Sequence, residues 1–561
     1  MLSNYVNRKY KTRVGFWLLT CLSVILTFAL IGNSSSIYAA EVTPDQLEFR
    51  RQAVQRMIFD RSQDIRLAGL WPAKVIGLDV MHPPVGPQIN DPKLEIEDGR
   101  LRISSNKAAT ATRWIGGFNP FTVYDAAVSK FTGAGAIGLM FRDTDAENRI
   151  TATLVVKDKL YRSIRCVITK DGQEAEHQDF ALPEALSCDS PIRLRVQMLA
   201  VGFNLFIERS GTSTLIGQMD FVKHFDLRKK DLMRRFEFCL HASLETDTSV
   251  EIDEVTAALS PGIGQADIRI VTYEDGAPFF KDGRLWMTIT VRGGGLSHPS
   301  MQGVYSVNPS VFDIRFEGII LYDRGDGLLR NDLASNLIYD RNEKEWRGFT
   351  VGFSSYGDPE KKEKKQILAI QSSKEPLQGL SIMEAKPAGL VGDYEDPQCI
   401  YDSQAKKWRM LLCENNHGYK AVIREADKWD GPYEKIAGPV KVDSTGTQIQ
   451  KIGQKRYALF GSADRKVYIY TYPDLKPSGE LKIHLPPWND KTGTRVWPNV
   501  IPLPAGYPAR YIALMMDRLN FPGIQGANWT YGAMYLYHAH SKHGEAVYEY
   551  SENSDDEQEG L

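Results

Sequence analysis

Short stretches of alternating apolar and polar residues dominate the chain from about residue 98 onward. Between residues 98 and 259 they are separated by polar turns, and helical periodicity is almost absent, which favours a β-sandwich over 63–260. The clearest of these stretches are Leu101–Ile103, Ala136–Phe141, Ile150–Val156, Ile192–Met198 and Phe203–Ile207. Ahead of them, Thr43 followed by Pro44 is typical of a helix start, and predicts a helix to about Ile58 within a 41–62 helical lead.

A second pattern begins after the turn-rich linker at residues 260–265. Residues 273–286, 329–346 and 394–408 each place an acid before a short apolar run, a polar turn and a second strand that opens near a Trp. Repeated strand–turn–strand units of this kind are typical of a β-propeller. Five units are expected over 265–542, and they begin near Asp275, Asp332, Asp396, Thr447 and Trp497. The expected fold is therefore all-β, and the acidic stretch 543–561 is expected to be a disordered tail.

Composition supports two domains and gives no sign of a strongly charged partner. The 561 residues are too many for one ordinary core, and 68 basic residues balance 70 acidic ones. This balance gives no indication of a nucleic-acid partner.

The N-terminus has the pattern of an export signal. Basic residues precede an apolar run at 14–31, and small residues follow up to Ala39 and Ala40, where cleavage is expected. The predicted signal peptide is 1–40 and the protein is expected outside the cytoplasm, periplasmic or extracellular. An uncleaved anchor remains the alternative, because 18 apolar residues are just enough to span a bilayer. Beyond residue 40 the cysteines are sparse and odd in number, so buried free thiols are expected rather than a disulfide framework.

The recurring acids carry the candidate chemistry. The first strand of a propeller unit lines the central axis, so acids at equivalent positions converge there, and cleavage of a glycosidic bond requires paired carboxylates. Asp275 precedes a run of small residues that leave its side chain open, and Asp332 lies beside Arg330. Glu395 has one more methylene of reach than Asp396. A single acid beside Gly or Pro is as easily a turn cap, so the threefold recurrence is what favours an enzyme.

These motifs resemble the five-bladed β-propeller glycoside hydrolases of the arabinanase, xylosidase and invertase-like group, over about residues 267–540. The intact Asn-Asp-Pro-Asn-Gly and Ala-Asp-Pro signatures of that group are absent, while Tyr394-Glu-Asp-Pro is close to its patterns. By blade position the resemblance implies Asp275 as base or nucleophile, Asp332 as orienting carboxylate and Glu395 as general acid. The run from Gly135 to Ile150 resembles a concanavalin/laminin-G-like jelly roll.

Further residues are expected around this pocket because strands that leave it return to the same face. Asp396, Glu414 and His298 are alternative catalytic residues. The expected substrate-binding residues, which offer guanidinium, imidazole, amide or indole groups, are Arg292, His298, His417, Gln448, Arg465, Arg495 and Trp497. For the two histidines a purely structural role is the commoner outcome.

The sequence therefore predicts an exported glycoside hydrolase that acts on a poly- or oligosaccharide. It leaves three alternatives: a non-catalytic carbohydrate-binding protein, a polysaccharide lyase that uses His298 or His417 on a uronate, and a glycoside phosphorylase. No cofactor is required and no metal ligand set is evident, although a structural calcium ion stays open. Retention or inversion depends on a carboxylate separation that sequence does not give.

Overall fold

The computed structural model describes residues 42–59, 64–74, 77–86, 88–292, 300–353, 363–488, 497–507, 509–519, 521–523 and 533–540. The predicted signal peptide at 1–40 and the predicted tail at 543–561 lie outside these ranges. Nearly all regular structure within them is β-strand. The helices are single turns: the 3-10 helices Pro44–Gln46 and Pro72–Lys74, α2 (Leu78–Met81) and α3 (Lys230–Met233). No helix in the described ranges is long and apolar enough to cross a membrane.

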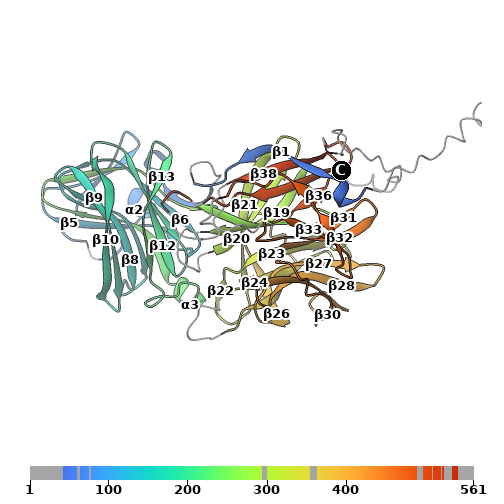
Figure 1. Cartoon of the computed structure of the whole chain (residues 1–561). Helices are drawn as coiled ribbons and strands as arrows, with labels where there is room; N and C mark the ends of the chain where they lie inside the picture. Colours follow the sequence, from blue (N-terminus) through green and yellow to red (C-terminus); the bar gives the residue numbers. More distant parts are fainter. Residues whose placement is uncertain are drawn as a thin grey trace, which may run out of the picture. The chain divides into compact units, whose positions relative to one another are not determined.

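Two sheets form residues 65–259 (Figure 1). One has the order β10-β9-β8-β7-β14-β5 and the other β13-β12-β11-β6-β15-β4-β3, with β2 added beside β15. Their strands are β2 (Ile65–Leu70), β3 (Lys93–Glu97), β4 (Arg100–Ser105), β5 (Ala109–Gly117), β6 (Val123–Thr132), β7 (Gly135–Asp143), β8 (Arg149–Lys157), β9 (Leu160–Lys170), β10 (Gln173–Ser187), β11 (Ile192–Met198), β12 (Gly202–Arg209), β13 (Thr212–Asp220), β14 (Phe236–Leu244) and β15 (Thr248–Leu259). Apolar side chains from both sheets share one buried cluster, in which the Tyr124 and Phe141 rings lie 4.8 Å apart.

The rest of the chain folds into antiparallel units of four strands each, which we number one to five in chain order. Unit one is β16 (Gly264–Ile270), β19 (Arg284–Arg292), β20 (Ser300–Asn308) and β21 (Asp313–Asp323). Unit two is β23 (Leu333–Asp340), β24 (Glu345–Gly352), β25 (Gln366–Ser372) and β26 (Gly379–Val391). Unit three is β27 (Tyr394–Asp402), β28 (Lys407–Asn415), β29 (Tyr419–Ala426) and β30 (Glu434–Ala437). Unit four is β31 (Thr445–Ile452), β32 (Lys455–Gly461), β33 (Val467–Thr471) and β34 (Pro477–Glu480).

Unit five takes its fourth strand from the other end of the chain. It consists of β36 (Val500–Pro502), β37 (Tyr511–Met516), β38 (Met534–His540) and β1 (Glu48–Gln55), with β35 (Lys482–Ile483) beside β1. Units one and two are joined into one sheet by parallel pairing of β21 with β26, and short strands β17 (Thr272–Tyr273), β18 (Phe280–Lys281) and β22 (Leu329–Arg330) extend it.

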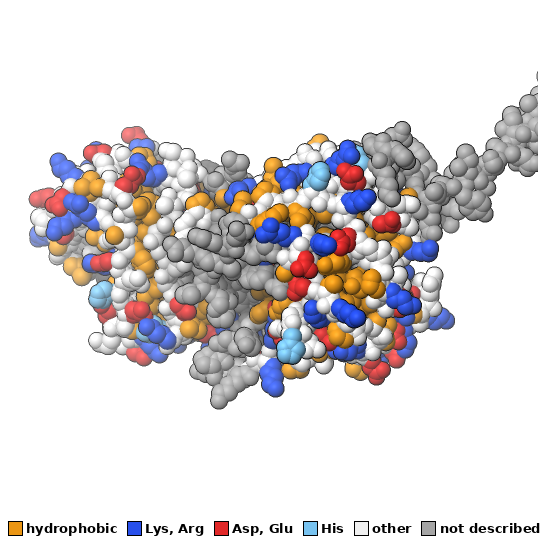
Figure 2. All heavy atoms as spheres, viewed as in Figure 1, with side chains coloured by type: hydrophobic (Ala, Val, Ile, Leu, Met, Phe, Trp, Pro, Cys, Tyr) orange, Lys and Arg blue, Asp and Glu red, His pale blue; other side chains and the backbone are white. Residues whose placement is uncertain are grey.

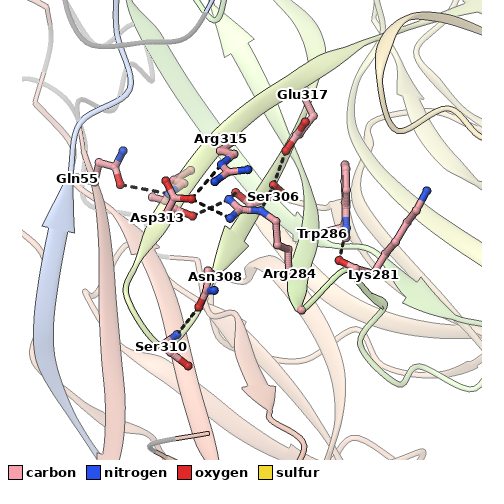
Figure 3. Close-up of polar contacts among 12 residues, drawn as sticks. Gln55, Lys281, Arg284, Trp286, Ser306, Asn308, Ser310, Asp313, Arg315 and Glu317 are labelled. Atoms are coloured by element: carbon pink, nitrogen blue, oxygen red, sulfur yellow. Dashed lines mark hydrogen bonds and ion pairs between the residues drawn. The ribbon is translucent and has the colours of Figure 1, made fainter. Parts of the chain in front are cut away.

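The expected N-terminal helix is therefore wrong. The Thr43 cap starts only one 3-10 turn, and the following residues pair antiparallel with β38 from Glu48↔His540 to Gln55↔Met534. Phe49 is completely buried there. Pairing with an open strand edge satisfies a whole row of backbone groups and overrides a local helix signal. Gln55 also accepts a hydrogen bond from Ile314 N of unit one at 3.3 Å (Figure 3), so β1 contacts the first and last units.

A β-bulge marks the same place in the first strand of units one to four. The register shifts between Ala266 and Arg269, Leu333 and Asn336, Glu395 and Gln398, and Thr445 and Gln448. One residue at each bulge has a left-handed backbone, with φ of 59° at Asp267, 55° at Ala334, 57° at Asp396 and 60° at Gly446. These four residues are structurally equivalent, and this equivalence aligns the units.

Buried amides connect one unit to the next just after the bulges. Asn336 Oδ1 accepts a hydrogen bond from Cys399 N at 2.9 Å, and Gln398 Oε1 accepts one from Ile449 N. Gln448 Oε1 accepts from Val500 N at 2.9 Å. The bonds join first strands at matching heights, so the bulged ends of β23, β27 and β31 and the start of β36 face the same way.

Candidate functional site

Three carboxylates interact at the bulged ends of the first strands: Asp267 of unit one, and Glu395 and Asp396 of unit three. Asp396 is 3% exposed. Its Oδ2 accepts a hydrogen bond from Gly446 N at 2.7 Å, and the Cys413 thiol lies 3.8 Å away. Burial, together with the charges of Glu395 and Asp267, raises the pKa of Asp396 to about 7 against the opposing charge of Arg269. Asp396 thus holds a proton near neutral pH.

Arg269 lies beside this acid in the bulge of unit one. It is 2% exposed, donates through Nη2 to Asp396 O at 2.8 Å and through Nη1 to Thr447 O, and lies 5.0 Å from the Trp497 ring centroid. Burial lowers the pKa of Arg269, an effect that Asp396 opposes. The Arg269 guanidinium therefore places a positive charge among the three carboxylates. It is hydrogen-bonded to main-chain carbonyls and packs on an aromatic ring.

Glu395 has a separate set of partners. Its Oε1 accepts hydrogen bonds from Lys365 Nζ and, at 2.6 Å, from the Tyr419 hydroxyl. Lys365 also donates to Asp393, and its ammonium lies 4.3 Å from the Phe353 ring centroid. Burial raises the pKa of Tyr419, and the negative charge of Glu395 adds to that rise, so the phenol stays a donor. One cation and one hydroxyl thus fix the Glu395 carboxylate.

Asp275 does not join these acids, because the structure places it at the opposite ends of the first strands. Strand β17, just before it, pairs with the last residues of β23, and Glu274 O accepts a hydrogen bond from Tyr401 N at 2.6 Å. Tyr401 lies five residues along the strand from Asp396, which corresponds to roughly 16 Å. The Asp275 carboxylate instead accepts from Ala277 N at 2.9 Å and pairs with Arg341 at 3.0 Å. It caps a turn.

Neither Asp332 nor Glu414 occupies the bulge position that Asp396 takes in unit three. Asp332 is fully buried and precedes β23, and the residue equivalent to Asp396 in unit two is Ala334. Glu414 pairs with Lys435 at 2.9 Å and Arg424 at 3.6 Å on the outer strands of unit three. Side chains alternate along a strand, so Cys413 faces Asp396 while Glu414 faces away.

The expected binding residues have mixed outcomes. Both polar atoms of the Gln448 amide bond to Val500, with Nε2 donating to Val500 O at 2.8 Å, so it links two strands. Trp497 lies at the site, against Arg269 and Gly446. Arg465 and the exposed His417 occupy turns at the bulged ends of units four and three, and the Arg465 guanidinium lies 4.1 Å from the Trp488 ring centroid. The Arg292 side chain, His298 and Arg495 lie outside the described residues.

Several site residues escape a reading of the sequence alone. Asp267, Arg269, Lys365 and Tyr419 have no motif of their own. A signal for Asp267 does exist, because Ala266-Asp-Ile-Arg lies in the first strand of unit one as Glu395-Asp-Pro-Gln lies in that of unit three. Within the described part of the chain, no group of three or more His, Cys, Asp or Glu side chains is placed to hold a metal ion.

Comparison with known proteins finds similarity to solved structures only, and at low sequence identity. No family model matches, and no curated protein matches. Among solved structures, it is similar to a thermostable family-43 glycoside hydrolase (13% identity, TM-score 0.32, 50% of this chain and 89% of that chain). It is also similar to the GH43_1 enzyme from Xanthomonas citri complexed with xylose (11%, 0.36, 52% and 93%). A third is the Emp46p carbohydrate recognition domain (13%, 0.26, 34% and 96%).

Proposed function

We propose that this protein is an exported glycoside hydrolase whose five four-stranded units are the blades of a propeller. The first strands would then surround the axis, and residues 63–260 would be a separate jelly-roll module. The observation that carries the proposal is the carboxyl group of Asp396. It is buried, its pKa is raised to about 7, and two further carboxylates and one guanidinium lie close enough to shift it.

The roles follow from what glycosidic cleavage requires: one acid that donates a proton to the leaving oxygen, and one carboxylate that acts as base or nucleophile. Asp396 is the proton donor in this proposal, because it holds its proton near neutral pH. Asp267, at the equivalent bulge of unit one, is the base or nucleophile. Glu395 is the third carboxylate, whose negative charge keeps the proton on Asp396. The reaction needs no cofactor.

Hydrolysis by the chain without residues 1–40 tests the proposal, on a panel of plant, algal and bacterial glycans. Asp267→Asn and Asp396→Asn should each abolish release of reducing sugar. Asp275→Asn is the matched control, because this acid lies at the other ends of the strands, and it should keep the wild-type rate. Circular dichroism and thermal unfolding establish that each variant folds.

Three other outcomes would each replace the proposal with a named alternative. Glycan binding without turnover by the wild type would indicate a lectin-like protein. A product that absorbs in the ultraviolet would indicate a lyase, and turnover that depends on phosphate a phosphorylase. Equal loss of activity in Asp275→Asn would instead contradict the assignment of the site.

A further inference from the structure

Arg269 differs in kind from the residues at the equivalent position in units two to four, which are amides. At the same place after the bulge, units two, three and four carry amides that bond to the neighbouring first strand: Asn336, Gln398 and Gln448. Arg269 of unit one is longer, and its guanidinium reaches main-chain carbonyls in units three and four. It therefore joins three units where each amide joins two.

The two carbonyl oxygens that accept hydrogen bonds from Arg269, those of Asp396 and Thr447, belong to one small region of backbone. The Asp396 carbonyl that takes the Arg269 hydrogen bond also accepts one from the Thr447 hydroxyl at 2.5 Å. Since Asp396 has a left-handed backbone, fixing its carbonyl fixes the direction in which its side chain leaves the strand. The Trp497 ring covers the guanidinium and also lies against Gly446, whose N–H bonds to the Asp396 carboxyl group.

We propose that Arg269 is the positioning residue of this site: it bridges units one, three and four and holds the backbone and the charge state of Asp396. The consequence for catalysis rests on the proposed function, whereas the effect on Asp396 itself does not.

The electrostatic part of this inference has a definite sign. Asp396 is faced by Asp267 from β16, by its neighbour Glu395 in β27, by Cys413 from β28 and by Gly446 N of β31. Burial and the two carboxylates raise the pKa of Asp396, while the Arg269 charge and the Gly446 hydrogen bond lower it. Removal of the guanidinium must therefore raise this pKa, and the proton should be held to higher pH.

Titration of the Asp396 carboxyl group tests the proposal without any need for activity. The signal is followed by NMR in protein labelled with carbon-13 at the aspartate carboxyl, and is assigned as the one absent from Asp396→Asn. We expect Arg269→Gln, which installs the side chain of units three and four, to move the midpoint upward by about one pH unit or more. Arg269→Lys keeps the charge and should move it far less.

Arg284→Gln is the matched control. Arg284 is 9% exposed and also lies in unit one, but it bonds to Ser306 and Asp313 (Figure 3) rather than to the site. It should leave the Asp396 midpoint unchanged. An unchanged midpoint in Arg269→Gln, or an equal shift in Arg284→Gln, would overturn the proposal. If Arg269→Gln does not fold, Arg269→Lys tests the proposal instead. An Asp396 midpoint shifted by a full pH unit in Arg269→Lys would contradict a role based on charge.

Activity measurements separate this inference from the proposed function. If the wild type hydrolyses a glycan, Arg269→Lys should lower kcat with little change in KM, because the positive charge remains but the bridge to two carbonyls is lost. If no glycan is hydrolysed while Arg269→Gln still shifts the Asp396 midpoint, the hydrolase assignment fails and the electrostatic role of Arg269 stands.

Discussion

Gly446 donates its backbone N–H to Asp396 Oδ2 at 2.7 Å, and both residues occupy the left-handed position of their bulges, with φ of 60° and 57°. Two features of this position require a glycine. It adopts this backbone without strain, and a Cβ there would lie 2.7 Å from Trp497 Cγ. The bulge of unit four thus serves the acid of unit three directly.

Gly446→Ala should therefore destabilise the protein by more than the left-handed backbone alone accounts for, which is about 1–2 kcal/mol. Gly283→Ala is the control, because Gly283 has φ of 68° but no atom within 4 Å of a Cβ. The difference between the two variants in urea-unfolding free energy measures the contact with Trp497. Equal losses would contradict close packing at this position.

The raised pKa of Asp396 predicts how stability changes with pH. A carboxyl whose pKa is higher in the folded than in the unfolded state adds stability that is complete below its ordinary value of 3.8 and lost as pH rises through about 7. Asp396→Asn should therefore be more stable than the wild type above pH 7, by on the order of 1–4 kcal/mol, and the gap should close toward pH 4. Denaturant unfolding of both proteins between pH 4 and 8 measures it. A gap independent of pH would contradict the shift.

The same group predicts a limit for activity. In the proposed mechanism kcat/KM falls as pH rises above about 7, because Asp396 loses the proton that it must donate. A pH profile of glycan hydrolysis checks this. Activity that keeps rising to pH 9 would exclude Asp396 as the acid.

Lys365 and Tyr419 should affect kcat, although neither is a catalytic carboxylate in the proposed reaction. Lys365→Met leaves Asp393 and Glu395 without their shared cation, so Glu395 should move away from its place and kcat should fall by up to about 100-fold. Tyr419→Phe removes one hydrogen bond and should cost less. Lys435→Met breaks a comparable pair with Glu414 in the same unit and should keep full activity. Steady-state kinetics on an identified substrate decide this, and an unimpaired Lys365→Met would contradict it.

The buried side-chain amides that connect the units predict an effect on stability at positions away from the candidate site. Gln398→Leu leaves Ile449 N without its acceptor in a buried place, which should cost about 1–3 kcal/mol. Gln404→Leu, at an exposed turn of the same unit, should cost almost nothing. Chemical denaturation of both variants measures the contrast, and a small effect at Gln398 would indicate that the strand ends rearrange.

The sequence was sufficient for the all-β class of fold and for the place of Glu395 and Asp396 at the start of a first strand. Alternation of apolar and polar residues finds strands reliably, and Cys399 and Cys413 are indeed free thiols on non-opposed positions. Figure 2 likewise shows acidic and basic side chains interspersed on the visible face, as the balanced charge implies. These properties depend on local pattern and composition alone.

The position of the acid in unit one could not be found in this way. In units two and three the left-handed residue lies twelve positions before the Trp of the second strand, as Asp396 does before Trp408. In unit one, residues 271–283 with two short strands separate β16 from β19, so Asp267 lies nineteen positions before Trp286. Counting back twelve positions from Trp286 gives Glu274, and its neighbour Asp275 caps the inserted turn. Cross-unit contacts such as those of Arg269 and Lys365 depend on tertiary packing and leave no local signal.

The pairing of β1 with β38 also determines when the protein can complete its fold. Glu48 and His540 are partners in one ladder, yet nearly the whole chain separates them. During synthesis β1 is made before units one to four and β38 after them, so unit five stays incomplete until those four units have been made. Closing so long a loop is slow, and until β1 pairs with it, β38 offers an unpaired edge to other chains. Phe49→Ala, which empties a buried site on β1, should therefore slow refolding and promote aggregation, whereas Val54→Ala at an exposed place on the same strand should do neither.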